Sequence, residues 1–300
     1  MRYELGVDVD AVKAIDTHVH IEVDDHGHTS LPQTLVDAAG SYFRAATTFP
    51  GLDEVADYYR ERNLAAVVFT VNAGTTLGHT GVSSEEVAEG AARNNDVLIP
   101  FGSVDPLTGD VAITEARRLV EEFGVRGFKF HPTVQGFDPS AEQFWPLYAE
   151  LEKFGLPVIF HTGQTGIGAG LRGGYGLKLW YSNPMLLDAV AADFPGLDIV
   201  MAHPSVPWQD EAIAVATHKA NMWIDLSGWS PKYFPEALVR QANSLLQDKV
   251  LFGSDYPLLK PDRWLADFEA LELKDAVRPK ILKQNAVRLL GLAPTPASQN

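Results

Sequence analysis

The sequence predicts an α/β protein: a single-domain (β/α)8 barrel, the TIM-barrel fold, over residues 1–300. Eight short apolar runs, rich in β-branched and aromatic residues, recur along the chain as expected for buried parallel strands. Segments with apolar residues at helical spacing lie between these runs. Strands that alternate with helices form a parallel sheet, and eight such units can close a barrel.

The expected elements follow one another at regular intervals. The strands are residues 14–21, 65–71, 97–104, 125–131, 157–161, 198–203, 222–226 and 250–254. The helices are residues 53–63, 84–94, 113–123, 141–154, 184–194, 209–218 and 235–246. The segment Ser83-Ser84-Glu85-Glu86 is typical of a helix start, and Gly124 and Gly155 stand where helices commonly end.

Two connections are longer than the others. Residues 22–64, after the first strand, must hold inserted structure. The connection after the fifth strand is a long glycine-rich loop with seven glycines between Gly163 and Gly176. The chain has no internal repeat and no low-complexity linker, so we expect one domain with a disordered tail after about residue 292.

The composition excludes several classes of protein. With 46% apolar and 21% charged residues, the chain is neither disordered nor fibrous. A formal charge of −15 repels nucleic acid and anionic membranes, so neither is an expected partner, although a local basic pocket can still bind a small anion. The absence of cysteine excludes disulfides, thiolate metal sites and a cysteine nucleophile.

No segment is typical of export or of a membrane span. The N-terminal residues MRYELGVDVD are acidic and lack the apolar stretch of a signal peptide, and no run of 18 apolar residues occurs. We therefore expect a cytoplasmic protein. Serine hydrolases, P-loop nucleotidases and zincin proteases have Gly-x-Ser-x-Gly, Gly-Lys-Ser/Thr and His-Glu-x-x-His motifs, and this sequence lacks all three.

Polar residues gather at the C-terminal ends of the expected strands, where barrels of this type have their active sites. These residues are His18 and His20 on the first strand, Lys129 and His131 on the fourth, His161 on the fifth, His203 on the sixth and Asp255 after the eighth. Scattered structural histidines would not fall at the same end of so many strands.

The spacing of these residues predicts a metal site. His18 and His20 are two residues apart, so both side chains can point to the barrel axis. Together with His161 and Asp255 they would supply three nitrogens and one oxygen, which suit Zn²⁺, Mn²⁺, Fe²⁺ or Co²⁺. We expect one divalent ion, with zinc as the default and manganese as the alternative. Each histidine alone is more often a structural residue, so the prediction depends on the combination.

The ordered motifs resemble those of the amidohydrolase superfamily. The resemblance is carried by Ile15-Asp16-Thr17-His18-Val19-His20, Phe160-His161-Thr162-Gly163, Ala202-His203-Pro204 and Phe252-Gly253-Ser254-Asp255-Tyr256-Pro257, and it extends over about residues 12–292. Within the superfamily, the chain resembles the amidohydrolase-related group that includes aminocarboxymuconate-semialdehyde decarboxylase and γ-resorcylate decarboxylase. It is also similar to hydrolases that cleave aryl β-ketoacyl-CoA thioesters between carbons.

The resemblance implies roles for five residues. His18, His20, His161 and Asp255 match the family's metal ligands. His203 matches a histidine that contacts the metal-bound water in mononuclear members, where it could act as a general base. Asp255 would both bind the metal and pass a proton.

Lys129 and His131 each have more than one interpretation. In binuclear members of the superfamily, a carboxylated lysine on the fourth strand bridges two metals. Lys129 should lie one layer deeper than His131, and a salt bridge or a contact with a substrate carboxylate is the preferred expectation. His131 is expected either to line the substrate pocket or to make a structural hydrogen bond.

Further substrate contacts are expected from loops. Arg172 and Lys178, in the glycine-rich connection, are candidates for a lid or an anion-binding loop, and a flexible surface connection is the alternative. Arg44 resembles in position an arginine that binds substrate carboxylate in some relatives, with a solvated arginine as the alternative. Three aromatic residues follow strand ends, where they could stack on an aromatic substrate or pack against the barrel rim: Trp208, Trp229 and Tyr256.

These observations predict a metal-dependent hydrolase in which metal-activated water attacks a carbonyl. By resemblance, its substrate is an aryl β-ketoacyl-CoA or another aromatic-catabolism intermediate, cleaved between carbons. The first alternative is non-oxidative decarboxylation of an aromatic or muconate-type acid at the same site. The second is a non-catalytic ligand-binding barrel. The expected partner is a small anionic and aromatic molecule, and the assembly is left open between a monomer and a homo-oligomer.

Overall fold

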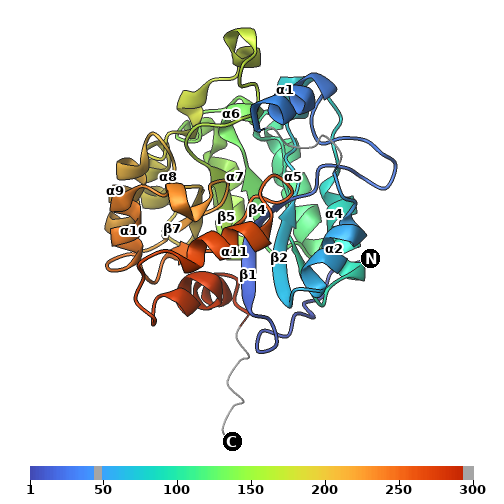
Figure 1. The fold of residues 1–300 in the computed structure, drawn as a ribbon. Coiled ribbons are helices and arrows are strands. Elements are labelled where there is room, and N and C mark those ends of the chain that lie inside the picture. The colour runs from blue at the N-terminus through green and yellow to red at the C-terminus, as the bar shows by residue number, and fades with distance from the viewer. Residues whose placement is uncertain (44–48, 293–300) are drawn as a thin grey trace, which may run out of the picture.

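The chain forms a closed (β/α)8 barrel in the computed structural model, which describes residues 1–43 and 49–292 (Figure 1). The strands are β1 (Ala14–His20), β2 (Leu64–Phe69), β3 (Leu98–Pro100), β4 (Phe128–Phe130), β5 (Val158–His161), β6 (Ile199–Ala202), β7 (Met222–Asp225) and β8 (Val250–Leu251). They pair in parallel in the orders β1-β2-β3 and β4-β5-β6-β7-β8. Gly102 pairs with Phe128, and Val19 with Tyr256, which joins the two sheets into one barrel. The predicted fold class is confirmed.

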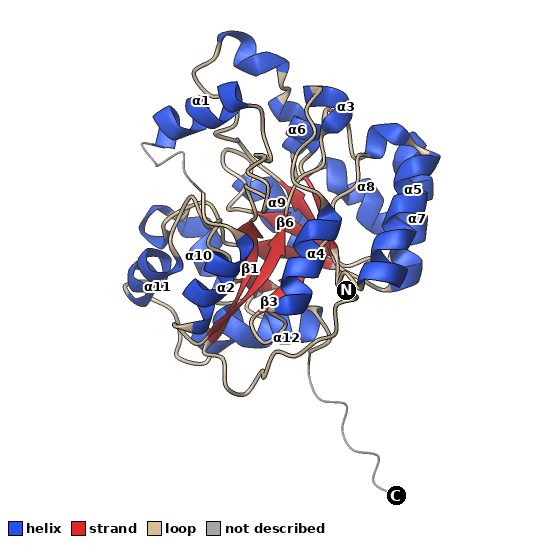
Figure 2. Ribbon diagram, turned by 90° about the vertical axis from the view of Figure 1, so that its right-hand side faces the viewer, coloured by secondary structure: helices blue, strands red, loops and turns tan. Residues whose placement is uncertain are grey.

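Helices surround the strands on all sides (Figure 2). They are α1 (Gln33–Phe43), α2 (Leu52–Arg60), α3 (Gly74–Leu77), α4 (Ser84–Arg93), α5 (Asp110–Arg118), α6 (Pro132–Gln135), α7 (Trp145–Phe154), α8 (Leu186–Asp193), α9 (Gln209–His218), α10 (Glu236–Ala242), α11 (Pro261–Glu269) and α12 (Asn285–Leu289). The two helices after β8 are not among those that the sequence predicts. On α11, Trp264 and Phe268 are buried at helical spacing, so the signal for that helix was present.

Strand side chains alternate between two apolar cores. On β2, Val67 and Phe69 belong to the cluster inside the barrel, whereas Val68 belongs to the cluster between strands and helices. On β1, the pairing register shifts between Asp16 and Val19. Because of this irregularity, Ile15 packs inside the barrel while Val19 packs outside it, and the histidines that flank Val19 turn inward.

Both long connections hold structure beyond the C-terminal ends of the strands. The insertion after β1 contains α1 and α2, and the connection after β5 contains the short helical turns η4 (Arg172–Gly176) and η5 (Leu179–Ser182). The segment around η4 stands clear of the barrel at the top of Figure 1. Arg44 and the tail after residue 292 lie outside the described residues. Within residues 1–43 and 49–292, no helix is long and apolar enough to cross a membrane.

Candidate metal centre

Three of the predicted metal ligands meet where β1 ends and the chain leaves β8. His18 Nε2 lies 3.2 Å from His20 Nε2, and Asp255 Oδ1 lies 3.3 Å from each of these nitrogens. Two imidazole nitrogens and a carboxylate oxygen this close together are stabilised by a shared cation. Their chemistry and spacing fit one divalent metal ion.

Asp225, the last residue of β7, orients His18. Its Oδ2 accepts a hydrogen bond of 2.9 Å from His18 Nδ1, so the lone pair of Nε2 faces the other donors. Burial alone would raise the pKa of Asp225, but contact with His18 holds that pKa far below its usual range. Burial, with Lys129 nearby, lowers the pKa of His18 to about 3 and keeps the ring neutral. The sequence prediction omits Asp225, although the seventh strand also ends with a polar residue.

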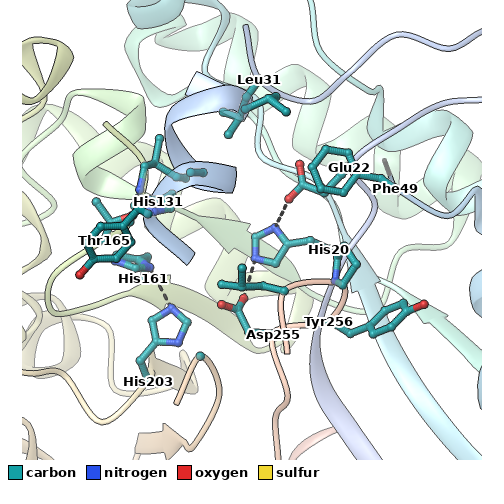
Figure 3. A pocket seen from close by; sticks show the side chains of 18 of the residues that line it. His20, Glu22, Leu31, Phe49, His131, His161, Thr165, His203, Asp255 and Tyr256 are labelled. Carbon is teal, nitrogen blue, oxygen red and sulfur yellow. Dashed lines mark hydrogen bonds and ion pairs between the residues drawn. The ribbon is translucent and has the colours of Figure 1, made fainter. Parts of the chain in front are cut away.

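Glu22 lies beside His20 as Asp225 lies beside His18. Its Oε1 lies 3.4 Å from His20 Nδ1, on the opposite side of the ring from Asp255 (Figure 3). Ser30 Oγ donates to the second oxygen of this carboxylate. The sequence prediction also omits Glu22, although its alternation with His18 and His20 was a readable signal.

Asp16 fixes the backbone beneath the cluster. Its Oδ1 accepts hydrogen bonds from the amides of His18 and Ser254, at 3.1 and 2.9 Å, and Tyr59 donates to its Oδ2 at 2.7 Å. Burial raises the pKa of Asp16 to about 7. The side chain therefore ties β1 to the segment that carries Asp255.

His161 and His203 form a pair beside the three donors. His203 Nε2 lies 2.9 Å from His161 Nδ1, and Ser227 Oγ lies 2.8 Å from His203 Nδ1 while donating to Asp225. Burial lowers the pKa of both histidines. His161 Nε2 is buried and has no hydrogen-bond partner among the described residues. A free, buried lone pair fits a further metal ligand, although His161 lies outside the group of three converging donors.

The backbone around these histidines is closely packed. His203 and Asp255 both have a φ of 71°, in the left-handed region that non-glycine residues seldom adopt. A Cβ on Gly228 would lie 2.6 Å from His203 Nδ1 and 3.3 Å from Asp255 Oδ2. Glycine at position 228 is therefore required for both side chains to stay in place.

The candidate centre opens into a cavity of about 620 Å³. Its polar lining includes His20, His131, His161, His203, Asp255 and Glu22, and its apolar wall includes Leu31, Val36, Phe49, Ile167, Trp229, Tyr256, Pro257 and Leu258. Among the described residues that line it, Lys260 is the one lysine or arginine. A mostly apolar cavity with a few converging polar groups is typical of a small-molecule site.

His131 and Lys129 lie at different depths. His131 lines the cavity and stacks on His161 with ring centres 3.7 Å apart, while its Nδ1 accepts a long hydrogen bond from the amide of Val134. Lys129 is fully buried, with Nζ 3.0 Å from His18 Nε2 and above the ring of Phe69. Burial lowers the pKa of Lys129 to about 8. The side chain lies beneath His18 and does not line the cavity, so a substrate contact by Lys129 stays a prediction.

Arg172 and Lys178 are exposed and do not line the cavity. The glycine-rich connection contributes residues 164–167 to the wall, and neither cation is among the lining residues. Their exposure agrees with the alternative of a surface connection, and binding of substrate by these two cations stays a prediction. Trp229 and Tyr256 line the cavity, whereas Trp208 does not and instead packs edge-on against Trp180, with ring centres 6.4 Å apart.

Comparisons with known proteins agree with the fold. The amidohydrolase family model matches residues 15–292. The γ-resorcylate decarboxylase of Rhodococcus jostii (strain RHA1) is 24% identical over 333 residues, which cover 88% of this chain and 97% of that protein. The 2-amino-3-carboxymuconate-6-semialdehyde decarboxylase of Dictyostelium discoideum is 24% identical over 243 residues, covering 70% and 66%. An uncharacterized TIM-barrel protein of Bordetella bronchiseptica has a similar structure, with a TM-score of 0.75, 25% identity and coverage of 93% and 98%.

Proposed function

The chain belongs to the amidohydrolase family, and on that premise we propose that it is a metal-dependent decarboxylase of a small aromatic acid. One observation carries the proposal: His18 Nε2, His20 Nε2 and Asp255 Oδ1 converge beside an apolar cavity. The two curated relatives are both named as decarboxylases, which favours decarboxylation over the hydrolysis that we first expected.

Four residues would hold the metal. His18, His20 and Asp255 offer the converging atoms, and His161 offers the buried lone pair of Nε2. A divalent ion bound there supplies positive charge that orients an anionic substrate and stabilises developing negative charge. Zinc stays our first expectation and manganese the alternative, since both accept imidazole and carboxylate ligands.

The reaction breaks the bond between a ring carbon and its carboxylate. The bonding electron pair stays on the ring carbon, carbon dioxide leaves, and a proton takes its place. We assign the proton transfer to His203 and Asp255, which both line the cavity. Ser227 Oγ forms a hydrogen bond with His203 Nδ1 and so orients the ring. Asp255 contacts His18 and His20 through Oδ1, while its Oδ2 lies beside Gly228.

The wall of the cavity suits an aromatic ring. Trp229, Tyr256 and Phe49 offer aromatic surface, and the apolar side chains beside them exclude water from the ring. Lys260 offers one cation to an anionic substituent at a distance from the metal ligands. A CoA thioester carries several phosphates, and one described lysine matches them poorly, which supports the smaller substrate.

The test is to distinguish loss of carbon dioxide from addition of water. Purified protein, after metal analysis, is assayed with hydroxybenzoates such as γ-resorcylate and with aryl β-ketoacyl-CoA thioesters. We expect carbon dioxide and the decarboxylated ring in equal amounts, with one solvent deuteron on the ring in D₂O. Thioester cleavage with uptake of one water, and no decarboxylation, would overturn the proposal.

A further inference from the structure

His131 is a buried residue of the cavity to which the proposed reaction gives no role. It follows β4 directly and lines the cavity, although it is only 2% exposed. Its ring lies parallel to that of His161, at 9° and with ring centres 3.7 Å apart (Figure 3). A buried polar side chain needs hydrogen-bond partners, and the two ring nitrogens of His131 differ in whether the protein supplies one.

The protein supplies a partner for Nδ1. The backbone amide of Val134, in the first turn of α6, donates to this nitrogen at 3.4 Å. The backbone of His131 is held at the same place, because its amide donates to Gln135 Oε1 at 2.8 Å. Gln135 Nε2 in turn donates to the carbonyls of Asn72 and Val104. The turn that follows β4 therefore fixes both the position and the orientation of the ring.

The contact at Nδ1 determines which nitrogen carries the ring proton. An amide N–H donates only to an unprotonated ring nitrogen, so the lone pair is on Nδ1 and the hydrogen is on Nε2. Among the described residues Nε2 has no hydrogen-bond partner, and unlike Nε2 of His161 it is not enclosed by protein atoms. Since His131 lines the cavity, an unpaired N–H donor opens onto it.

We propose that His131 is a specificity-determining residue, whose Nε2–H donates a hydrogen bond to an oxygen of the substrate beside the metal. The inference rests on the proposed function, because the ring of the candidate ligand His161 lies against that of His131. Two groups of a hydroxybenzoate offer such an acceptor, the carboxylate and a ring hydroxyl. An analogue without the oxygen would leave the donor unpaired, which is how a buried polar group selects its ligand.

Two substitutions separate the roles of the two ring nitrogens. His131→Asn keeps an oxygen near the place of Nδ1, where it can still accept from the amide of Val134, but it has no atom at the place of Nε2. His131→Gln has the opposite pattern, because its longer side chain can bring an amide N–H to the place of Nε2 but no acceptor to that of Nδ1. A ring that only caps the turn predicts that Asn is silent and Gln harmful.

The first experiment measures the binding of benzoate and of resorcinol to metal-loaded protein by isothermal titration. Benzoate offers only a carboxylate, and resorcinol offers only ring hydroxyls. We expect His131→Asn to weaken at least one of them about 10–100-fold, the loss expected for a hydrogen bond to a charged group. His131→Gln should bind the same probe more tightly than His131→Asn does. Weaker benzoate binding assigns the contact to the carboxylate, and weaker resorcinol binding assigns it to a ring oxygen.

The second experiment reads the tautomer without metal, ligand or turnover. Long-range ¹H–¹⁵N correlation spectra of protein labelled with ¹⁵N-histidine distinguish a protonated from an unprotonated ring nitrogen. We expect the signals of His131, assigned by their loss in either variant, to show a proton on Nε2 and none on Nδ1. If the wild type shows this tautomer and the expected loss of binding but releases no carbon dioxide, the proposed function fails and this inference stands.

Three results would overturn the inference. One is a His131 ring with its proton on Nδ1. Another is a His131→Asn variant that binds both probes within about threefold of the wild type, well below the loss of a charged hydrogen bond. The third is a fall in the metal content of His131→Asn that accounts for its weaker binding, because the ring would then act by supporting His161. Metal analysis and circular dichroism are therefore performed on each variant.

Discussion

The candidate metal centre and the glycine-rich connection after β5, residues 163–182, differ in how their polar side chains are held. In the centre, His18 donates from Nδ1 to Asp225, and His20 has Glu22 at its Nδ1. Asp16 accepts a hydrogen bond from the backbone amide of His18. On the glycine-rich connection after β5, Arg172 and Lys178 are exposed, and neither has an ion pair among the described residues. The difference teaches that residues at strand ends are positioned by the barrel, whereas the barrel does not fix the two cations of that connection.

Loss of a proposed ligand should have the largest effect. His20→Ala removes one of the three converging atoms, so we expect metal affinity to fall by more than about 100-fold, beyond the usual effect of an indirect partner. Decarboxylation should be lost with the metal. Competition against a coloured chelator measures the affinity, and His218→Ala, an exposed histidine on α9, is the control. Equal affinities for the two variants would contradict the proposed centre.

The second prediction separates proton transfer from metal binding. His203→Asn should keep near-normal metal content and lower kcat by about 10²–10⁴-fold, the usual range for a lost acid–base group. Elemental analysis and steady-state kinetics on the same preparation give both values. If metal content and activity fall together, His203 is itself a ligand. Lys129, beside His18, should then be examined for carboxylation.

The third prediction compares Asp225, which accepts from His18, with Glu22, which lies beside His20. Asp225→Asn presents an amide group to His18 Nδ1, which favours the tautomer with its proton on Nε2, so metal affinity should fall about 10–100-fold. Glu22→Gln should have a smaller effect, because its 3.4 Å contact with His20 is longer and partly exposed. Isothermal titration with the metal measures both. An effect of Glu22→Gln that exceeds that of Asp225→Asn would reverse this order.

The smallest predicted effect is on the pH dependence of stability in metal-free protein. Burial lowers the pKa of His18, His131, His161 and His203 below the ordinary 6.5, so below that pH the unfolded chain binds protons that the folded chain does not. His18, His131 and His161, whose pKa lies well below 6.5, should each reduce the stability of the protein by about 1 kcal/mol between pH 6.5 and about pH 5.5. His203 acts in the same direction. Asp16 has the opposite effect, because its pKa is raised to about 7 and the folded chain therefore gains stability from protonating it as the pH falls. It is one group against four histidines. Denaturant melts should therefore show a net loss, and a flat profile would contradict the buried neutral histidines.

The sequence predicted the fold and most of the strand-end residues because both depend on local patterns. Short apolar runs locate strands, and the barrel then places every strand end at one face, which is how His18, His20, His161, His203 and Asp255 were found. Glu22 and Asp225 were missed although their positions, alternating with the histidines and at the end of the seventh strand, were visible in the sequence. Their contacts with the histidine rings become clear only in three dimensions. The depth of Lys129 followed from alternation along β4.

The loops were less predictable for a physical reason. Arg172 and Lys178 lie in a glycine-rich segment whose course is set by left-handed glycines and by its anchor at Thr133, not by a periodic pattern. Sequence proximity to the fifth strand suggested a place beside the substrate, but neither cation is among the residues that line the cavity. Arg44 stays a prediction, since it lies outside the described residues.

The most direct test is a crystal structure of metal-loaded protein with anomalous data collected at the absorption edge of the metal. We predict one anomalous peak, at about 2.0–2.2 Å from His18 Nε2, His20 Nε2 and an Asp255 oxygen, with His161 Nε2 as the fourth ligand. A peak bound instead by Asp225 and His203, or two peaks bridged by Lys129, would contradict the proposed single-metal centre.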